Sequence, residues 1–296
     1  MTTINGDPRA DNRNTPVQPL DSESYDIMAR LFIPLGKRAC PLYARVGGRG
    51  YDVIGTAVPV RGQHYAALLT ASHVIDELED GQVVLAGSRT FLRFPAITVR
   101  FSHSRPAPAV DADVAAIALP ATAAEELSEY YEFTGAGDAG EFEDYNELTL
   151  YGFVGCPHTK NREAKRHTAE RMVKPYFYVT REYAALPAEN GKRTAVHVAL
   201  QAPLRTVNGP GGRIVSAPDP HGISGCGVWK VKLAPHTGQS SVPELVGIGI
   251  EYQARSGVFV ATRMGAGSIA ITQLWKQLDE GRSAATTLEL REDPIP

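Results

Sequence analysis

A serine flanked by glycines is the first candidate for chemistry in this sequence. Ser224 follows Gly222 by two positions and directly precedes Gly225, in the segment His-Gly-Ile-Ser-Gly-Cys-Gly-Val-Trp (221–229). Glycine allows backbone N–H groups to turn toward one point, as stabilisation of a developing oxyanion requires. The N–H groups of Gly222 and Ser224 are the candidate donors. The pattern also fits a tight turn before a strand, so a catalytic interpretation needs a base and an orienting acid elsewhere.

His73 and Asp113 are the candidate base and acid. His73 follows a β-prone run in Thr-Ala-Ser-His-Val, where a buried strand stops and a helical turn begins. That position is rigid and close to solvent, which suits a general base, although a locally hydrogen-bonded histidine would fit equally. Asp113 opens a continuous apolar run, where a carboxylate needs donors such as a histidine N–H. Asp111 is the alternative acid, and either aspartate could instead cap a turn.

The elements that must position these residues are mostly strands. Runs rich in β-branched and aromatic residues alternate with Gly- and Pro-containing turns, and the chain holds Gly 28 and Pro 21. Near the C-terminus Ile271, Leu274, Trp275 and Leu278 form an apolar stripe at helical spacing. We expect six segments: an arm (1–37), a β unit with His73 and Asp113 (38–133), a connection (134–147), a β unit with Ser224 (148–265), a helix (266–281) and a tail (282–296).

Composition narrows the classes of function. The chain has 296 residues, 43% of them hydrophobic and 21% charged, which is typical of a soluble globular protein. A formal net charge of −3 gives no general attraction to nucleic acid or anionic membranes. The basic stretch 160–174 lacks aromatic residues and is interpreted as a solvated loop. We therefore expect no nucleic-acid or membrane partner.

Cysteine usage and the N-terminus favour a cytoplasmic protein. The three cysteines are an odd number, and the first residues lack the apolar core of a secretory signal. Cys156 and His158 are too sparse for a zinc site, because no second ligand pair follows at the usual spacing. We expect neither a metal nor a cofactor. Cys226 is interpreted as a small buried residue, with an oxidant-sensing thiol as the alternative.

The order His73, Asp113, Ser224 gives these motifs a family resemblance. The sequence resembles the trypsin-like (chymotrypsin-fold) serine proteases, of bacterial intracellular type, from about Leu42 to Leu278. The likeness is carried by three motifs around these residues, Thr70–Val74, Asp113–Ala115 and Gly222–Gly225. Leu245–Tyr252 resembles the strand that lines the family's substrate cleft, and Gly257–Phe259 resembles the opposite pocket wall.

The resemblance implies an all-β fold of two antiparallel six-stranded β-barrels with a C-terminal helix, and a site in the cleft between the barrels. It implies that Ser224 is acylated by a peptide carbonyl, that His73 acts as base and then acid, and that Asp113 holds the imidazole tautomer. Gly222 and Ser224 would form the oxyanion hole. The partner is a peptide or protein substrate, and a dedicated protein partner is a further possibility.

The sequence also departs from the family. Ile223 stands where digestive members carry an aspartate that pairs with a new N-terminus, so we expect no activation of that type. The substrate pocket is less clearly defined. Its candidates are residues near Ser224 and on the cleft strand, with the acidic ones favouring a basic side chain. They are Asp219, Ile250, Glu251, Tyr252 and Gly257.

The sequence thus predicts a serine endopeptidase that works through a Ser-His-Asp triad and an acyl-enzyme. The alternative from a different class is a protease-fold binding or scaffold module whose cleft is closed or unproductive. An esterase of the α/β class is excluded, because that class places its serine first, on a strand-to-helix elbow. Here Ser224 comes last and leads into a strand.

Overall fold

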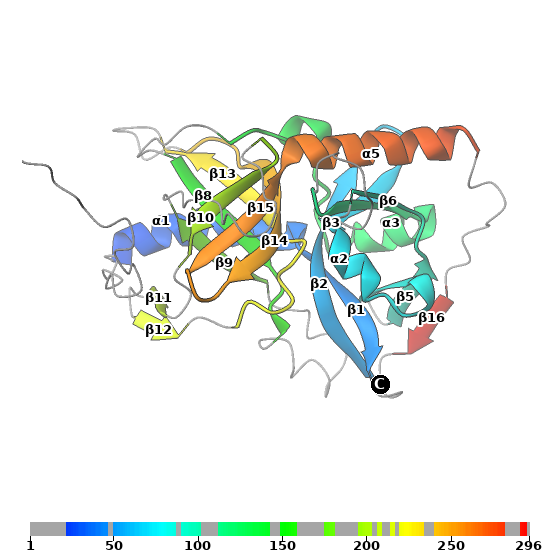
Figure 1. Ribbon diagram of the computed structural model, residues 1–296, viewed down its shortest axis with the longest axis horizontal. Helices are drawn as coiled ribbons and strands as arrows, with labels where there is room; N and C mark the ends of the chain where they lie inside the picture. Colours follow the sequence, from blue (N-terminus) through cyan, green and yellow to red (C-terminus); the bar gives the residue numbers. More distant parts are fainter. Residues whose placement is uncertain are drawn as a thin grey trace, which may run out of the picture.

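Two β-rich halves lie side by side, and a long helix extends from their junction over one of them (Figure 1). The structure is a computed structural model. It describes residues 22–46, 50–86, 90–101, 112–142, 149–158, 175–180, 195–202, 206–208, 214–216, 219–233, 240–281 and 291–294. All strand pairings among these residues are antiparallel. The prediction of a mostly β fold with a C-terminal helix is confirmed.

The first half is built on a five-stranded sheet of order β1-β2-β3-β7-β6. Its strands are β1 (Cys40–Val46), β2 (Gly50–Arg61), β3 (Ala66–Ala71), β6 (Thr98–Phe101) and β7 (Val114–Leu119). Every residue of β7 is buried, and so is all of β3 after Ala66. Such continuous apolar runs have no solvated face, which makes the centre of this sheet a rigid platform. Short helices flank it: α2 (Ser72–Asp76), α3 (Ala121–Leu127), η3 (Glu79–Gly81) and η4 (Ala136–Asp138).

A smaller sheet of order β16-β5-β4 completes the first half. Its strands are β4 (Gln82–Ala86), β5 (Thr90–Pro95) and β16 (Arg291–Pro294). The sequence predicts only a polar tail over 282–296, yet its residues 291–294 pair with β5. An edge strand offers a row of unpaired N–H and C=O groups, and these can order a polar segment that has no hydrophobic pattern of its own.

The second half is a six-stranded sheet of order β10-β15-β14-β13-β8-β9. The strands are β8 (Thr149–Gly155), β9 (Tyr176–Thr180), β10 (His197–Gln201), β13 (Gly227–Lys232), β14 (Glu244–Gln253) and β15 (Val258–Arg263). A separate pair joins β11 (Thr206–Asn208) to β12 (Ile214–Ser216). Among the described residues the strand pairings do not close two six-stranded barrels, so that finer expectation goes beyond the observed sheets.

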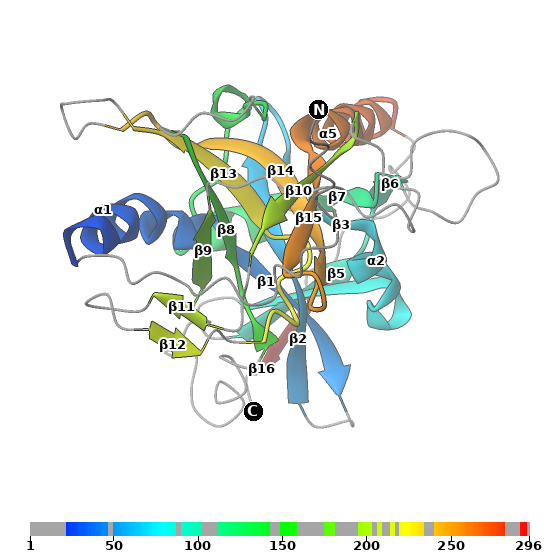
Figure 2. The ribbon, with the colours of Figure 1, turned by 60° about the vertical axis from the view of Figure 1, so that its left-hand side comes forward.

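Part of the predicted arm packs on the second half. Helix α1 (Ser22–Phe32) and the 3-10 turn η2 (Pro34–Arg38) lie beside β8 and β9 (Figure 2). Phe32 is fully buried, and a Cβ on Gly152 of β8 would lie 2.1 Å from its ring. The glycine therefore makes room for the aromatic ring, which fastens this segment to the sheet. Residues 1–21 lie outside the described residues.

Helix α5 (Met264–Asp279) follows β15 of the second half and extends from there over the first half (Figure 1). Its predicted apolar stripe is observed: Ile271 and Leu274 are buried. Trp275 lies against Gly62 in the β2–β3 turn, where a Cβ on the glycine would lie 2.5 Å from the indole. No helix within the described ranges has both the length and the apolar character that crossing a membrane requires.

Candidate active site

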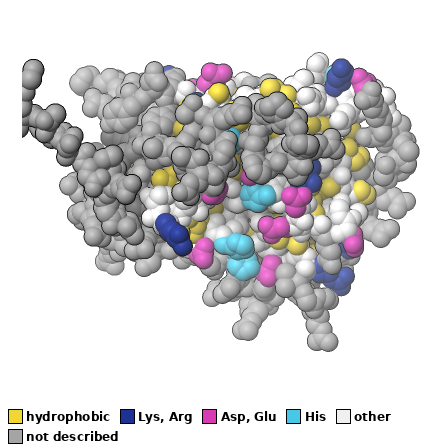
Figure 3. Space-filling model, viewed as in Figure 1, with side chains coloured by type: hydrophobic (Ala, Val, Ile, Leu, Met, Phe, Trp, Pro, Cys, Tyr) yellow, Lys and Arg dark blue, Asp and Glu magenta, His cyan; other side chains and the backbone are white. Residues whose placement is uncertain are grey.

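His73 lies at the junction between a buried strand and a short helix, as the sequence predicts. β3 ends at Ala71, whose extended backbone (φ −73°, ψ 142°) precedes α2. The strand is buried, whereas the exposed fraction of the His73 side chain is 40%. Rigid backbone thus anchors an imidazole that solvent can still reach. Histidine and acidic side chains lie close together near the centre of the face in Figure 3.

Strand register brings Asp113 to the same end of the sheet as His73. β7 pairs with β3 so that Val114 lies opposite Ala71. His73 comes two residues after Ala71, and Asp113 comes one residue before Val114. Both side chains therefore emerge where the two strands end, although 40 residues separate them along the chain.

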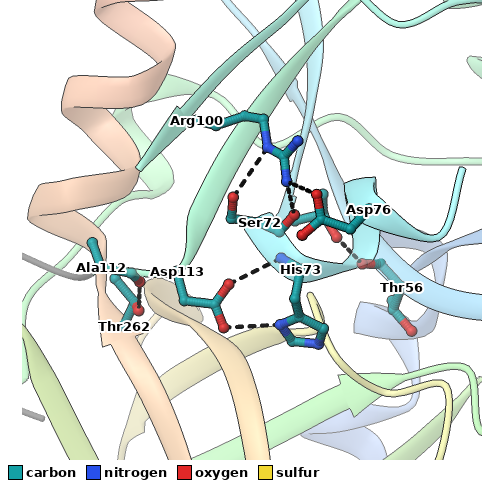
Figure 4. Close-up of polar contacts among 9 residues, drawn as sticks. Thr56, Ser72, His73, Asp76, Arg100, Ala112, Asp113 and Thr262 are labelled. Carbon is teal, nitrogen blue, oxygen red and sulfur yellow. Dashed lines mark hydrogen bonds and ion pairs between the residues drawn. The ribbon is translucent and has the colours of Figure 1, made fainter. Parts of the chain in front are cut away.

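Asp113 binds His73 through both carboxylate oxygens (Figure 4). Oδ2 lies 2.8 Å from His73 Nδ1, and Oδ1 accepts a hydrogen bond of 3.0 Å from the His73 backbone N–H. Because an ionised carboxylate can only accept, Nδ1 carries a proton, and in the neutral imidazole Nε2 then keeps a lone pair. A general base needs this tautomer. The alternative acid, Asp111, lies outside the described residues.

Two further hydrogen bonds hold the unusual backbone of Asp113. Its φ of 42° is in the left-handed region, which aspartate tolerates better than most residues. The Asp113 carbonyl accepts a bond of 3.1 Å from Ser72 N–H, and the Thr262 hydroxyl donates to the carbonyl of Ala112 (Figure 4). Thr262 belongs to β15, so the second half of the molecule helps to orient the carboxylate. Sequence reasoning missed this threonine.

Arg100 of β6 fixes the short helix that carries His73. Its Nε donates to Ser72 Oγ at 3.2 Å, its Nη2 donates to the Ser72 carbonyl at 2.9 Å, and the guanidinium pairs with Asp76 (Figure 4). These partners flank His73 on both sides along the chain. The sequence gives no local signal for this clamp, because it depends on how β6 pairs with β7.

Glycine contacts locate the loop of residues 219–226, here called the serine loop, against the first half. Gly225 has a φ of +86°, and a Cβ on it would lie 2.0 Å from the Thr56 carbonyl oxygen and 3.0 Å from Ala71 N. Only glycine fits such a gap at such a φ. The loop backbone next to Ser224 therefore touches the end of β3, two residues before His73.

The backbone of Ser224 lies close to α2. The Ser224 carbonyl accepts a hydrogen bond of 2.8 Å from Thr56 N–H on β2. A Cβ on Gly55 would lie 3.1 Å from the Ser224 carbonyl oxygen and 2.6 Å from Val74, the residue after His73. The structure thus brings the predicted serine, histidine and aspartate to one region. Among the described groups, Ser224 Oγ has no hydrogen-bond partner.

The peptide group between His221 and Gly222 is fixed by a hydrogen bond to its carbonyl oxygen. The His221 carbonyl accepts a hydrogen bond of 2.7 Å from His158 N–H. In a trans peptide the N–H points opposite to the C=O, so the Gly222 N–H points away from His158. Gly222 has a φ of +89°, and a Cβ on it would lie 2.9 Å from His158 N.

The peptide group before Ser224 is held in the same way. The Ile223 carbonyl accepts a hydrogen bond of 2.9 Å from Cys226 N–H, so the Ser224 N–H points away from that partner. Within the described ranges, neither the Ser224 N–H nor the Gly222 N–H has a hydrogen-bond acceptor.

The pocket candidates on β14 differ in burial. The Ile250 side chain is 2% exposed and packs in the core, whereas Glu251 and Tyr252 are partly exposed. Glu251 Oε1 accepts a hydrogen bond of 3.0 Å from Gln253 Nε2. Gly257 has a φ of +64° in the turn between β14 and β15. Of the side chains in this group, those of Glu251 and Tyr252 are the ones that a ligand can reach.

Asp219 is the first residue of the serine loop, and it lies near Tyr178 and Tyr252. Its Oδ1 accepts a hydrogen bond of 3.0 Å from His221 N–H in the serine loop. Burial, then the neighbouring Tyr176 and Tyr252, raise the pKa of Tyr178, and Asp219 acts in the same direction. Asp219 and Tyr252 therefore both lie around Tyr178, beside the serine loop.

Cys226 is buried two residues after Ser224, which agrees with its interpretation as a small buried residue. Burial raises the pKa of its thiol, and burial likewise raises the pKa of Cys156 to about 12. A thiol reacts as the thiolate, so both groups are unreactive near neutral pH.

No protein-family model and no curated protein sequence matches the chain. Several solved protease structures are similar to it at low identity. The MamO protease domain from Magnetospirillum magneticum is 13% identical, with a TM-score of 0.42, over 80% of this chain and 96% of that one. A Glu endopeptidase is 9% identical, with a TM-score of 0.41, over 82% and 89%. The serine protease domain of the Sesbania mosaic virus polyprotein is 13% identical, with a TM-score of 0.36, over 76% and 88%.

Proposed function

We propose that the protein is a serine endopeptidase whose catalytic residues are His73, Asp113 and Ser224. The observation that carries this proposal is the pair of contacts between Asp113 and His73. Asp113 Oδ2 lies 2.8 Å from His73 Nδ1, and Oδ1 lies 3.0 Å from the His73 backbone nitrogen. A purely structural aspartate needs no such pairing with a half-exposed imidazole. The serine loop, packed against the end of β3, supplies a hydroxyl in the same region.

The proposed reaction begins with attack of Ser224 Oγ on the carbonyl carbon of a peptide bond. His73 Nε2 takes the hydroxyl proton, and Asp113 stabilises the imidazolium that results. The carbonyl oxygen becomes an oxyanion, which the N–H groups of Gly222 and Ser224 receive. His73 then gives the proton to the leaving amine. Water, activated by the same imidazole, hydrolyses the acyl-enzyme.

The finer features of the resemblance belong to this proposal. Two barrels would flank the site. Asp219, Glu251 and Tyr252 would line the substrate pocket with their side chains, whereas Ile250 and Gly257 would contribute only backbone. With Asp219 and Glu251 near its rim, the pocket would favour a basic side chain. The substrate class is a peptide or protein.

A binding module of protease fold is the second candidate. The absence of a hydrogen bond to Ser224 Oγ among the described groups favours it, because a docking protein needs no activated hydroxyl. For an enzyme, the contact between Ser224 and His73 must instead form when substrate is bound, as catalytic hydrogen bonds often do.

Turnover on a peptide library separates the two candidates. The enzyme predicts cleavage by the wild type and a loss on the order of a million-fold in Ser224→Ala, because the triad acts as a unit. Ser268→Ala, which alters an exposed serine on α5, is the matched control and should keep the wild-type rate. Peptide binding without cleavage by the wild type would favour the binding module.

A further inference from the structure

Thr56 of β2 connects the first half to the serine loop through its hydroxyl. The residue is fully buried. Its Oγ1 donates to the Gly222 carbonyl at 2.9 Å and accepts from Cys156 N–H at 2.9 Å. One hydroxyl thus satisfies a buried acceptor in the serine loop and a buried donor just after β8, using both its donor and its acceptor capacity.

The backbone of Thr56 supports the same junction. Its N–H donates to the Ser224 carbonyl at 2.8 Å, and its carbonyl accepts from the Thr70 hydroxyl at 2.7 Å. Thr70 belongs to β3, which ends two residues before His73. Thr56 of β2 thus bonds, through its backbone and its side chain together, to β3, to the chain after β8 and to the serine loop.

This network fixes the direction of the Gly222 N–H. His158 N–H holds the peptide plane before Gly222 through the His221 carbonyl, at 2.7 Å. The Thr56 hydroxyl holds the plane after Gly222 through the Gly222 carbonyl, and the Ile223 N–H of the same plane donates to the Pro220 carbonyl at 3.0 Å. With both flanking planes held, φ and ψ of Gly222 are fixed, and so is the direction of its N–H.

The serine loop by itself bonds only one of the two peptide planes that flank Gly222, through the Ile223 N–H and the Pro220 carbonyl. Glycine reaches many φ values at little cost, so Gly222 at a φ of +89° has no backbone preference of its own that keeps its N–H in place. Its neighbour Ile223 is apolar and 3% exposed, and it brings no charge that an ion pair could hold. His158 supplies the hydrogen bond to the plane before Gly222, and Thr56 adds a second hydrogen bond to the plane after it.

We propose that Thr56 is a positioning residue, whose hydroxyl keeps the Gly222 N–H directed at the substrate oxyanion. The inference rests on the proposed hydrolase function and adds to it a means of keeping the oxyanion hole formed without a charged anchor in the serine loop. Thr56 touches no reacting atom, so its effect passes through Gly222.

Thr56→Val removes the hydroxyl and preserves the shape of the side chain. We expect kcat to fall about 100-fold, the loss typical of one oxyanion donor. KM should stay within about threefold, because the interaction strengthens only in the transition state. Thr56→Ser keeps the hydroxyl and should recover most of kcat. Thr149→Val on β8 is the matched control: its buried Oγ1 has no partner within the described ranges, so kcat should not change.

A merely structural role predicts a different pattern. It lowers the melting temperature of Thr56→Val but leaves kcat per folded molecule at the wild-type value, and that result would overturn the proposal. If Thr56→Val does not fold, Thr56→Ala replaces it, with the same expected loss in kcat and the same overturning result.

Crystal structures separate a failure of this inference from a failure of the proposed function. If the wild type cleaves no peptide, the hydrolase proposal fails, yet the positioning claim is still testable. In Thr56→Val the peptide after Gly222 should rotate, so that its carbonyl leaves the wild-type position. An unrotated peptide would refute the role of Thr56 whether or not the enzyme is active.

Discussion

At the residue scale, Asp113 fixes both the position and the protonation of His73. Its Oδ1 accepts a hydrogen bond from the His73 backbone N–H, which keeps the carboxylate in place. Its Oδ2 binds Nδ1 of the ring, so rotation of the imidazole would break this second contact. The exposed fraction of the Asp113 side chain is 19%, which leaves the charge partly shielded from water and strengthens the pairing.

Asp113→Asn tests this fixation. The asparagine NH2 would donate to Nδ1, so the proton would move to Nε2 and the imidazole would lose its role as base. We expect kcat to fall about 10⁴-fold, while the melting temperature changes little because the side-chain shape is kept. Asp26→Asn, which alters an exposed aspartate on α1, is the control and should retain the wild-type kcat. A variant Asp113→Asn with more than a tenth of wild-type activity would contradict the assigned role.

At the element scale, the ends of β3 and β7 and the serine loop meet because no side chain stands between them. The contact at Gly225 is the tightest of these approaches: a Cβ would lie 2.0 Å from the Thr56 carbonyl oxygen and 2.1 Å from Thr70 Oγ1. Neither atom can move freely, since each is part of the hydrogen-bonded junction of β2 with β3. The junction therefore depends on this glycine.

Gly225→Ala should separate the loop from the strands. The added Cβ meets backbone at a φ of +86°, so we expect a loss of about 2–4 kcal/mol in the free energy of unfolding, together with loss of activity. Gly265→Ala in the first turn of α5 has nothing within 4 Å of its new Cβ and should stabilise the protein by up to about 1 kcal/mol. Urea denaturation of both variants measures the contrast; equal free energies would show that the close approach at Gly225 is unimportant.

At the scale of the whole molecule, α5 connects the halves that carry the proposed triad. The helix begins directly after β15, while its far end meets the β2–β3 turn, where Trp275 covers Gly62 and Tyr65 Oη donates to Asp279 at 2.6 Å. Because His73 and Ser224 come from different halves, any relative shift of the halves changes the distance between base and nucleophile.

Trp275→Ala removes the indole that covers Gly62. We expect a loss of about 2–3 kcal/mol in the free energy of unfolding, because the partly buried ring leaves a gap between helix and turn. Lys276→Ala, next to it but with a side chain 75% exposed, should change this free energy by less than about 0.5 kcal/mol. Thermal denaturation compares the two, and equal stability would argue against α5 as a connection between the halves.

The sequence predicts the local features of the site well. Buried β runs end beside His73 and begin beside Asp113, so the strand pattern alone sets both residues at strand ends. The contribution of Thr56, Arg100 and Thr262 could not be predicted, because each bonds to a segment that is distant in the chain. Such contacts depend on register and sheet packing, which local periodicity does not contain. The pairing of β16 was missed for a related reason, because residues 291–294 form a strand only through hydrogen bonds to the edge strand β5.

Labelling with a fluorophosphonate tests the central claim most directly, because the reagent forms a bond only with a serine that a neighbouring base activates. Digestion and mass spectrometry of the labelled wild type should locate one adduct, on Ser224. His73→Gln should remain folded and unlabelled, and Ser268→Ala should label as the wild type does. A folded wild type that takes up no label, or an adduct that persists in Ser224→Ala, would contradict the proposal that His73, Asp113 and Ser224 act together.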